Sequence, residues 1–103
     1  MTGTDPIAAV LLDARARLDS GKWCKRQDFD SNGNMCMQGA LMAALNGVEA
    51  DVDIYKIERL LGKHMWCSSI PGFNDAPETT LADVLTVFDK ALAESGALDR
   101  VTP

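Results

Sequence analysis

The chain has few aromatic residues, a single histidine and no long hydrophobic run. Its longest apolar run near the amino end, residues 7–12, is too short for the core of a secretory signal and follows no basic segment. No stretch approaches the roughly twenty consecutive apolar residues that a membrane-spanning helix needs. We therefore expect no signal peptide and no membrane association.

Positive charge is also scarce, with 10 Lys and Arg against 15 Asp and Glu and a net charge of −5. General binders of the nucleic-acid backbone depend on clustered Lys and Arg, so we expect no nucleic-acid partner. A phosphate-binding glycine loop and a Ser/His/Asp arrangement are both missing from the sequence. The charge is uneven, because residues 15–26 hold five of the basic residues whereas residues 75–99 hold six acids against Lys90 alone.

The sequence also lacks the cysteine pattern of a disulfide-bonded scaffold. The three cysteines, Cys24, Cys36 and Cys67, are odd in number and lack the spacing of a disulfide-rich scaffold. Reduced thiols of this kind are typical of the cytoplasm, which is the predicted location.

What is present has the composition of a globular protein, with 47% hydrophobic and 24% charged residues in 103 positions. Such a chain can bury one modest core and lies far from the composition of disordered segments. We expect a single domain over residues 1–103, as a monomer or a small homo-oligomer.

Hydrophobic spacing predicts a mainly α fold, a compact bundle of about four helices. Helix caps and stop residues limit the expected helices to residues 6–20, 39–45, 54–61 and 81–95. Asp5 with Pro6 would start the first helix, Asp51 or Asp53 the third, and a capping box of Thr80 and Asp83 the fourth. Between the first two, the turn residues 30–33 predict a loop or short hairpin. Residues 63–79 are expected to be an irregular connector.

Three short motifs are spaced along the chain. They are Trp23-Cys24, Cys36-x-x-Gly39-Ala40-Leu41 and Asn74-Asp75-x-Pro77-x-x-Thr80. Together they resemble the spaced motifs of a family of small uncharacterised proteins from actinobacteria and their phages. The resemblance implies an origin, a fold and a cluster of family-motif residues, and no activity. That cluster is Trp23, Cys24, Cys36, Gly39, Asn74, Asp75, Pro77 and Thr80.

Cys36 is the one candidate nucleophile with a plausible setting. Near the amino end of a helix, unpaired N–H groups and the helix dipole can lower the pKa of a thiol. His64 as base and Asn74 as its orienting partner would then complete the residue types of a cysteine hydrolase. The interpretation we favour has no catalytic residue. It makes Cys36 a small buried residue beside Gly39, and Asn74-Asp75 a turn.

Two metal sites can be considered and neither is favoured. Cys24, Cys36, His64 and Cys67 could supply four zinc ligands, but Cys24 and Cys36 stand twelve positions apart and form no tight knuckle. Residues 28–34 resemble the first half of a calcium loop, but the twelfth position is Gly39 and not a bidentate glutamate. We expect no metal and no cofactor.

Both tryptophans, Trp23 and Trp66, stand directly before a cysteine in an irregular segment. We expect them to be buried and to pin the two loops against the second helix. The alternative is that they form the walls of a small-molecule pocket or a hot spot for a protein partner.

These patterns favour a small acidic accessory protein that acts through contacts with a protein partner. One alternative is a small cysteine-dependent enzyme or ligand-binding protein that uses the region of Cys36, His64 and Asn74. A further alternative, suggested by the acidic C-terminal segment and the resemblance to phage proteins, is an inhibitor of a host or defence protein.

Overall fold

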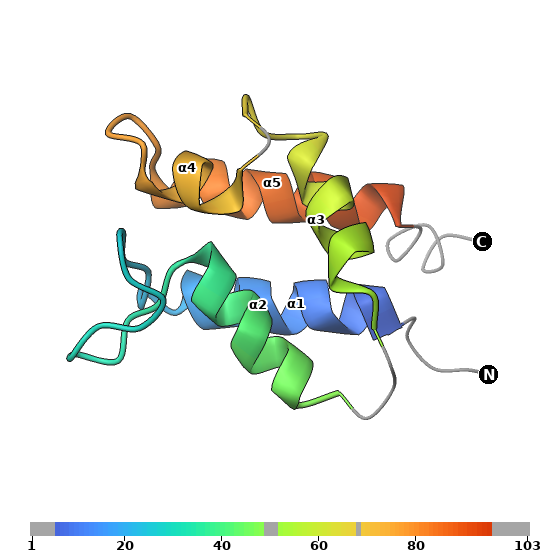
Figure 1. Cartoon of the computed structure of the whole chain (residues 1–103), viewed down its shortest axis with the longest axis horizontal. Coiled ribbons are helices and arrows are strands. Elements are labelled where there is room, and N and C mark those ends of the chain that lie inside the picture. Colours follow the sequence, from blue (N-terminus) through green and yellow to red (C-terminus); the bar gives the residue numbers. More distant parts are fainter. Residues whose placement is uncertain (1–5, 49–51, 68, 96–103) are drawn as a thin grey trace.

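Five helices form in the part of the chain that the computed structural model describes, residues 6–48, 52–67 and 69–95. They are α1 (Pro6–Asp19), α2 (Met37–Asn46), α3 (Ile54–Gly62), α4 (Ile70–Asp75) and α5 (Leu81–Glu94) (Figure 1). The prediction of a mainly α fold is confirmed. Across these three stretches no strand forms, and no helix is long and apolar enough to cross a membrane.

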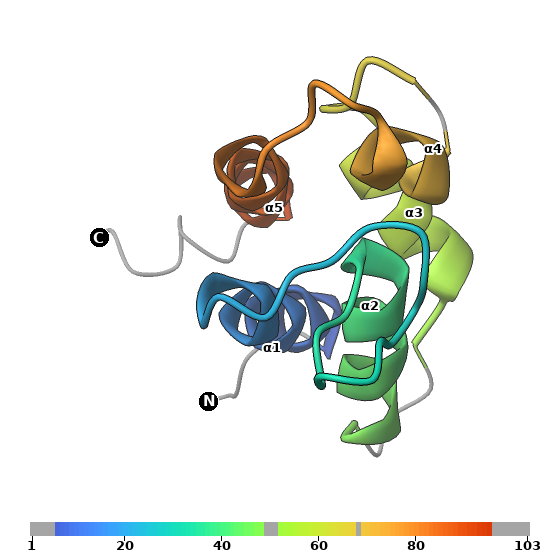
Figure 2. The ribbon, with the colours of Figure 1, turned by 90° about the vertical axis from the view of Figure 1, so that its left-hand side faces the viewer.

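The core lies between two layers of helices. Figure 2 shows α1 and α5 side by side in one layer and α2, α3 and α4 in the other. The buried residues of α1 and α5 recur at the spacing of one helical face, and Phe88 of α5 is completely buried. An ion pair between Arg15 Nε and Asp89 Oδ1, at 2.6 Å, joins the two helices on their outer side. The two longest helices therefore form the base on which the shorter ones pack.

The helix starts follow their predicted caps where the structure describes them. Asp53 accepts a hydrogen bond from the N–H of Tyr55 at the start of α3. Thr80 and Asp83 form the complete capping box of α5, with both reciprocal bonds present. The proposed caps Asp5 and Asp51 lie outside the described residues.

Helix α4 is a correction to the prediction of an irregular connector. It has only six residues, which is too few for hydrophobic periodicity to reveal. Its start is fixed by Ser69, whose hydroxyl oxygen accepts a hydrogen bond from the N–H of Gly72 at 3.1 Å. Asn74 and Asp75 therefore lie in a helix and not in a turn. The Asn74 side chain lies in the interior of the protein, and the Asp75 side chain lies beside it.

The α1–α2 loop, residues 20–36, folds around a tight turn. Asp30 Oδ1 accepts hydrogen bonds from the N–H groups of Asn32 and Asn34, both at 2.9 Å. The hydrogen bonds from Asn34 hold the pKa of the Asp30 carboxyl below its ordinary value. Gly33 has φ of 84°, which favours glycine. The calcium-like spacing of this segment is thus accounted for by a polar turn.

Candidate functional site

Asn74 stands at the centre of a hydrogen-bond network that joins three segments of the chain. Its side chain is completely buried on α4. Oδ1 accepts bonds from Trp23 Nε1 at 2.7 Å and from the backbone N–H of Met37 at 3.1 Å. Nδ2 donates to the carbonyl oxygen of Cys24 at 3.1 Å and to Asp75 Oδ1 at 3.0 Å. The amide therefore uses both donors and accepts two bonds, so its hydrogen-bonding capacity is fully satisfied.

Asp75 and Lys25 fasten the α1–α2 loop at two further points. Asp75 Oδ1 accepts a bond from the backbone N–H of Arg26 at 2.7 Å, and Lys25 Nζ donates to the carbonyl oxygen of Ala76 at 2.6 Å. Arg26 has φ of 74°, a strained value for a residue with a side chain. The bond to Asp75 helps to hold that conformation. We call these contacts, with those of Asn74, the Asn74 network.

Cys36 and Gly39 fit the same loop onto the start of α2. Cys36 is the N-cap of this helix, and its Sγ accepts a bond from the N–H of Gly39 at 3.4 Å. The backbone N–H of Cys36 donates to the carbonyl oxygen of Asp28 at 3.3 Å. A Cβ atom on Gly39 would lie 2.1 Å from that same oxygen. The Cys-x-x-Gly spacing is therefore explained by a sulfur cap and by the close approach of the loop backbone.

The surroundings of Cys36 do not support the alternative in which the start of α2 lowers the pKa of its thiol. Burial raises the pKa of Cys36, and the N–H groups of Gly39 and Gln38 offset this only in part. The Asp28 carboxyl, which accepts a bond from Sγ at 3.5 Å, raises it further. Burial and the nearby Asp30 also raise the pKa of Cys24. Since the thiolate is the nucleophile, neither thiol is activated.

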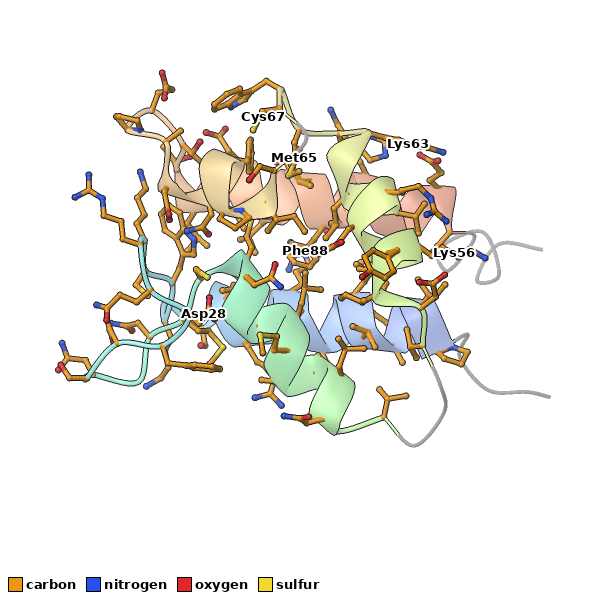
Figure 3. All side chains as sticks on the ribbon, viewed as in Figure 1. Asp28, Lys56, Lys63, Met65, Cys67 and Phe88 are labelled. Atoms are coloured by element: carbon orange, nitrogen blue, oxygen red, sulfur yellow. The ribbon has the colours of Figure 1, made fainter. Side chains whose placement is uncertain are left out.

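His64 lies in a different part of the molecule. Its Nε2 is 2.9 Å from Glu94 Oε1, and Lys63 pairs with the other oxygen of the same carboxylate. The hydrogen bond from Lys63 is the largest influence that lowers the pKa of Glu94, and the contact with His64 lowers it further. Lys63 precedes His64 in the chain, and Asp28 accepts a hydrogen bond from Cys36. Figure 3 shows Lys63 and Asp28 on opposite sides of the protein. The structure therefore places Asn74 beside the start of α2 but does not bring His64 to Cys36.

The four alternative zinc ligands are not assembled. The thiols of Cys24 and Cys36 both make hydrogen bonds within the α1–α2 loop. Cys24 Sγ donates to the carbonyl oxygen of Gln27 at 3.5 Å. Cys67 bonds instead to the carbonyl oxygen of Ser69. Within residues 6–48, 52–67 and 69–95, no group of three or more His, Cys, Asp or Glu side chains could hold a metal ion.

The remaining motif residues have separate roles. Thr80 caps α5, and Pro77 is exposed between α4 and α5. Trp23 is partly rather than fully buried, and its indole N–H donates to Asn74 of α4, a helix that the prediction did not include. Trp66 corrects the corresponding prediction, because its side chain is 65% exposed.

Trp66 borders a groove of about 400 Å³ that sequence reasoning did not find. Its ring packs at a tilt of 56° on Phe73 of α4, with the ring centroids 6.1 Å apart. The walls also include Glu78, Asp83 and Lys90. The lining residues on α5 recur at the spacing of one helical face, and this spacing is the sequence signal that could have revealed the groove. Those lining residues are Asp83, Thr86, Val87 and Lys90.

A second, wider depression of about 540 Å³ lies along α3. Its walls come from α3 and from the residue that follows it: Tyr55, Glu58, Arg59, Gly62 and Lys63. The Trp66 groove is smaller, but α4, α5 and the segment after α3 enclose it together, and it alone holds a packed pair of aromatic rings. We therefore take the Trp66 groove as the candidate binding site.

These features define a small, mainly α protein in which a buried amide network fastens a long loop to a two-layered helical core. The chain belongs to a family of unknown function, DUF6197, whose profile matches residues 2–94. Searches among curated proteins and among solved structures give no match.

Proposed function

We propose that this protein is a small acidic accessory protein of the cytoplasm that acts through protein–protein contacts, with the Trp66 groove as its contact surface. The observation that supports this most is the exposure of Trp66, whose side chain is 65% accessible beside a groove. The three cysteines are unpaired, which fits a reducing compartment.

An exposed tryptophan is costly in a protein with so small a core. Burying an indole removes about 150–250 Å² from water, so leaving two thirds of it exposed forgoes about 2–4 kcal/mol of hydrophobic stabilisation. Partner proteins recover that energy, and tryptophan is among the residues most enriched at the energetic centres of protein interfaces. Among the described residues, the other large apolar side chains that are exposed do not border this groove, which favours Trp66 as the anchor. They are Leu12, Phe29, Met42 and Tyr55.

The alternative enzyme has less structural support. Cys36 is only 5% exposed, and its contacts with Gly39 and Asp28 account for its place in the motif. Asn74 uses its hydrogen bonds within the fold and leaves none for orienting a histidine. These residues therefore support the fold, and the exposed groove supports binding.

A matched pair of variants tests the proposal. Tagged wild-type protein, Trp66→Ala and Tyr55→Ala would be purified from cells of the encoding organism, and co-purifying proteins would be quantified by mass spectrometry. Tyr55 is a suitable control because it is 69% exposed but lies on α3, outside the groove. A partner that uses Trp66 as a hot spot should decrease at least tenfold with Trp66→Ala and be unchanged with Tyr55→Ala. Equal recovery of every protein with all three baits would contradict the proposal.

A further inference from the structure

We propose that the Trp66 groove binds an arginine side chain presented by a segment of the partner protein. This inference rests on the proposed function, since it names the chemistry that the same surface recognises. Three features of the described residues support it: the shape of the groove, the placement of its charges, and two charged side chains that have no ion-pair partner.

The groove has an apolar floor with a single large exposed ring. Val87 and Phe73 are almost completely buried, whereas Trp66 remains open to solvent. Phe73 supports the indole through the tilted ring contact, so the indole is held against α4. A flat ring of this kind, with one face or edge available, suits a planar group that can stack on it.

Charge is separated along the groove. Asp83 lies in the first turn of α5 and Glu78 lies in the segment just before that helix, whereas Lys90 lies two turns after Asp83 on the same face. Seven residues of helix correspond to about 10 Å. In the part of the chain that the structure covers, neither Glu78 nor Lys90 has an ion-pair partner, and Asp83 engages Oδ2 in the capping box. The groove therefore offers negative charge at one end and positive charge at the other.

Arginine matches the negative end best. Its guanidinium group stacks on an indole by cation–π attraction and can also donate paired hydrogen bonds to a carboxylate. Its methylene stem can lie on the apolar floor while the charged group reaches Glu78 and Asp83. An apolar side chain would bury the Glu78 carboxylate without a partner, and an acidic one would be repelled by it. The net charge of −5 also attracts a cationic segment over longer range.

Lys90 adds a second feature to the expected partner segment. At about 3.3 Å per residue, three residues of extended chain cover the roughly 10 Å of helix from Asp83 to Lys90. The preferred segment thus carries an acidic residue about three positions from the arginine.

The probe is a capped peptide of glycine and alanine that carries one arginine and, three residues later, one glutamate. Its binding would be followed by the indole N–H signals of the ¹⁵N-labelled full-length protein. The Trp66 signal should shift and saturate, whereas the Trp23 signal, bonded to Asn74, should stay in place as an internal control. Citrulline in place of arginine should weaken binding at least fivefold, because it keeps the shape and loses the charge.

Two variants distinguish binding in the groove from a general attraction of the cationic peptide to the acidic protein. Glu78→Gln should weaken peptide binding at least threefold, and Glu58→Gln, the same change on α3 outside the groove, should leave it unchanged. The inference is overturned if the citrulline peptide binds equally well, if the Trp66 signal does not saturate, or if both variants behave alike. It is also overturned if the Trp66 signal shifts on dilution of the protein alone, since the occupant is then a second copy.

Failure of this inference and failure of the proposed function give different experimental results. A partner that depends on Trp66, combined with no preference for arginine, keeps the protein-contact function and rejects this inference. Saturable binding of the arginine peptide without any Trp66-dependent partner supports the site and contradicts the proposed function.

Discussion

Asn74→Ala is expected to lower the free energy of unfolding by about 3–5 kcal/mol. The change leaves three groups without their partner: the indole N–H of Trp23, the backbone N–H of Met37 and the carbonyl oxygen of Cys24. Each buried polar group that loses its bond costs about 1–3 kcal/mol. Since small proteins are stable by only about 5–15 kcal/mol, this loss is a large share of the total. Chemical denaturation of the two proteins measures it.

Asn46→Ala is the matched control. Asn46 is exposed at the end of α2, and the described residues give its side chain no hydrogen-bond partner. Its replacement should change the unfolding free energy by less than about 0.5 kcal/mol. If Asn74→Ala were equally mild, Asn74 would not hold the α1–α2 loop.

Gly39→Ala is the second large effect, with an expected loss of about 1–3 kcal/mol. The added Cβ would lie 2.1 Å from the carbonyl oxygen of Asp28, so either the loop or α2 must move. Overpacking of this kind costs about 1–3 kcal/mol, and displacement of Asp28 also weakens its bond from the N–H of Cys36. This outweighs the gain of about 1 kcal/mol that alanine brings to a helix interior.

Gly62→Ala separates the steric effect from helix propensity. A Cβ at Gly62, the last residue of α3, would meet no atom within 4 Å. The variant should be unchanged or more stable by up to about 1 kcal/mol. Thermal or denaturant unfolding of both glycine variants gives the comparison, and a similar loss in the two would mean that the Asp28 contact does not decide the effect.

The longer helices were predictable because their signals are local. The capping box of Thr80 and Asp83 lies within four residues, and the buried face of α5 repeats every three or four positions. Helix α4 was missed because six residues are too few for such a repeat. Its role as a platform for Asn74 depends on chain segments 37 and 51 residues away, which no local pattern reveals.

The candidate sites show the same division. The position of Cys36 at the start of α2 follows from local sequence, but the direction of its pKa shift depends on burial by the loop that folds over it. Trp66 was expected in the core because it is large and apolar. In the fold its ring packs against Phe73, and most of its side chain remains exposed to solvent. Because burial depends on the tertiary fold, the sequence could single out Trp66 but could not predict whether its side chain is buried or exposed.

Whether the motif residues hold the fold together or carry out chemistry is tested most directly by the rate at which iodoacetamide alkylates each thiol. The folded protein would be treated near neutral pH, and Cys24, Cys36 and Cys67 would be followed separately by peptide mass spectrometry. Cys36 is buried and its pKa is raised by that burial, so it should react at least tenfold more slowly than Cys67, which is partly exposed, and reach the same rate after denaturation. Selective and rapid alkylation of Cys36 in the folded state would contradict a structural role and point instead to a reactive cysteine.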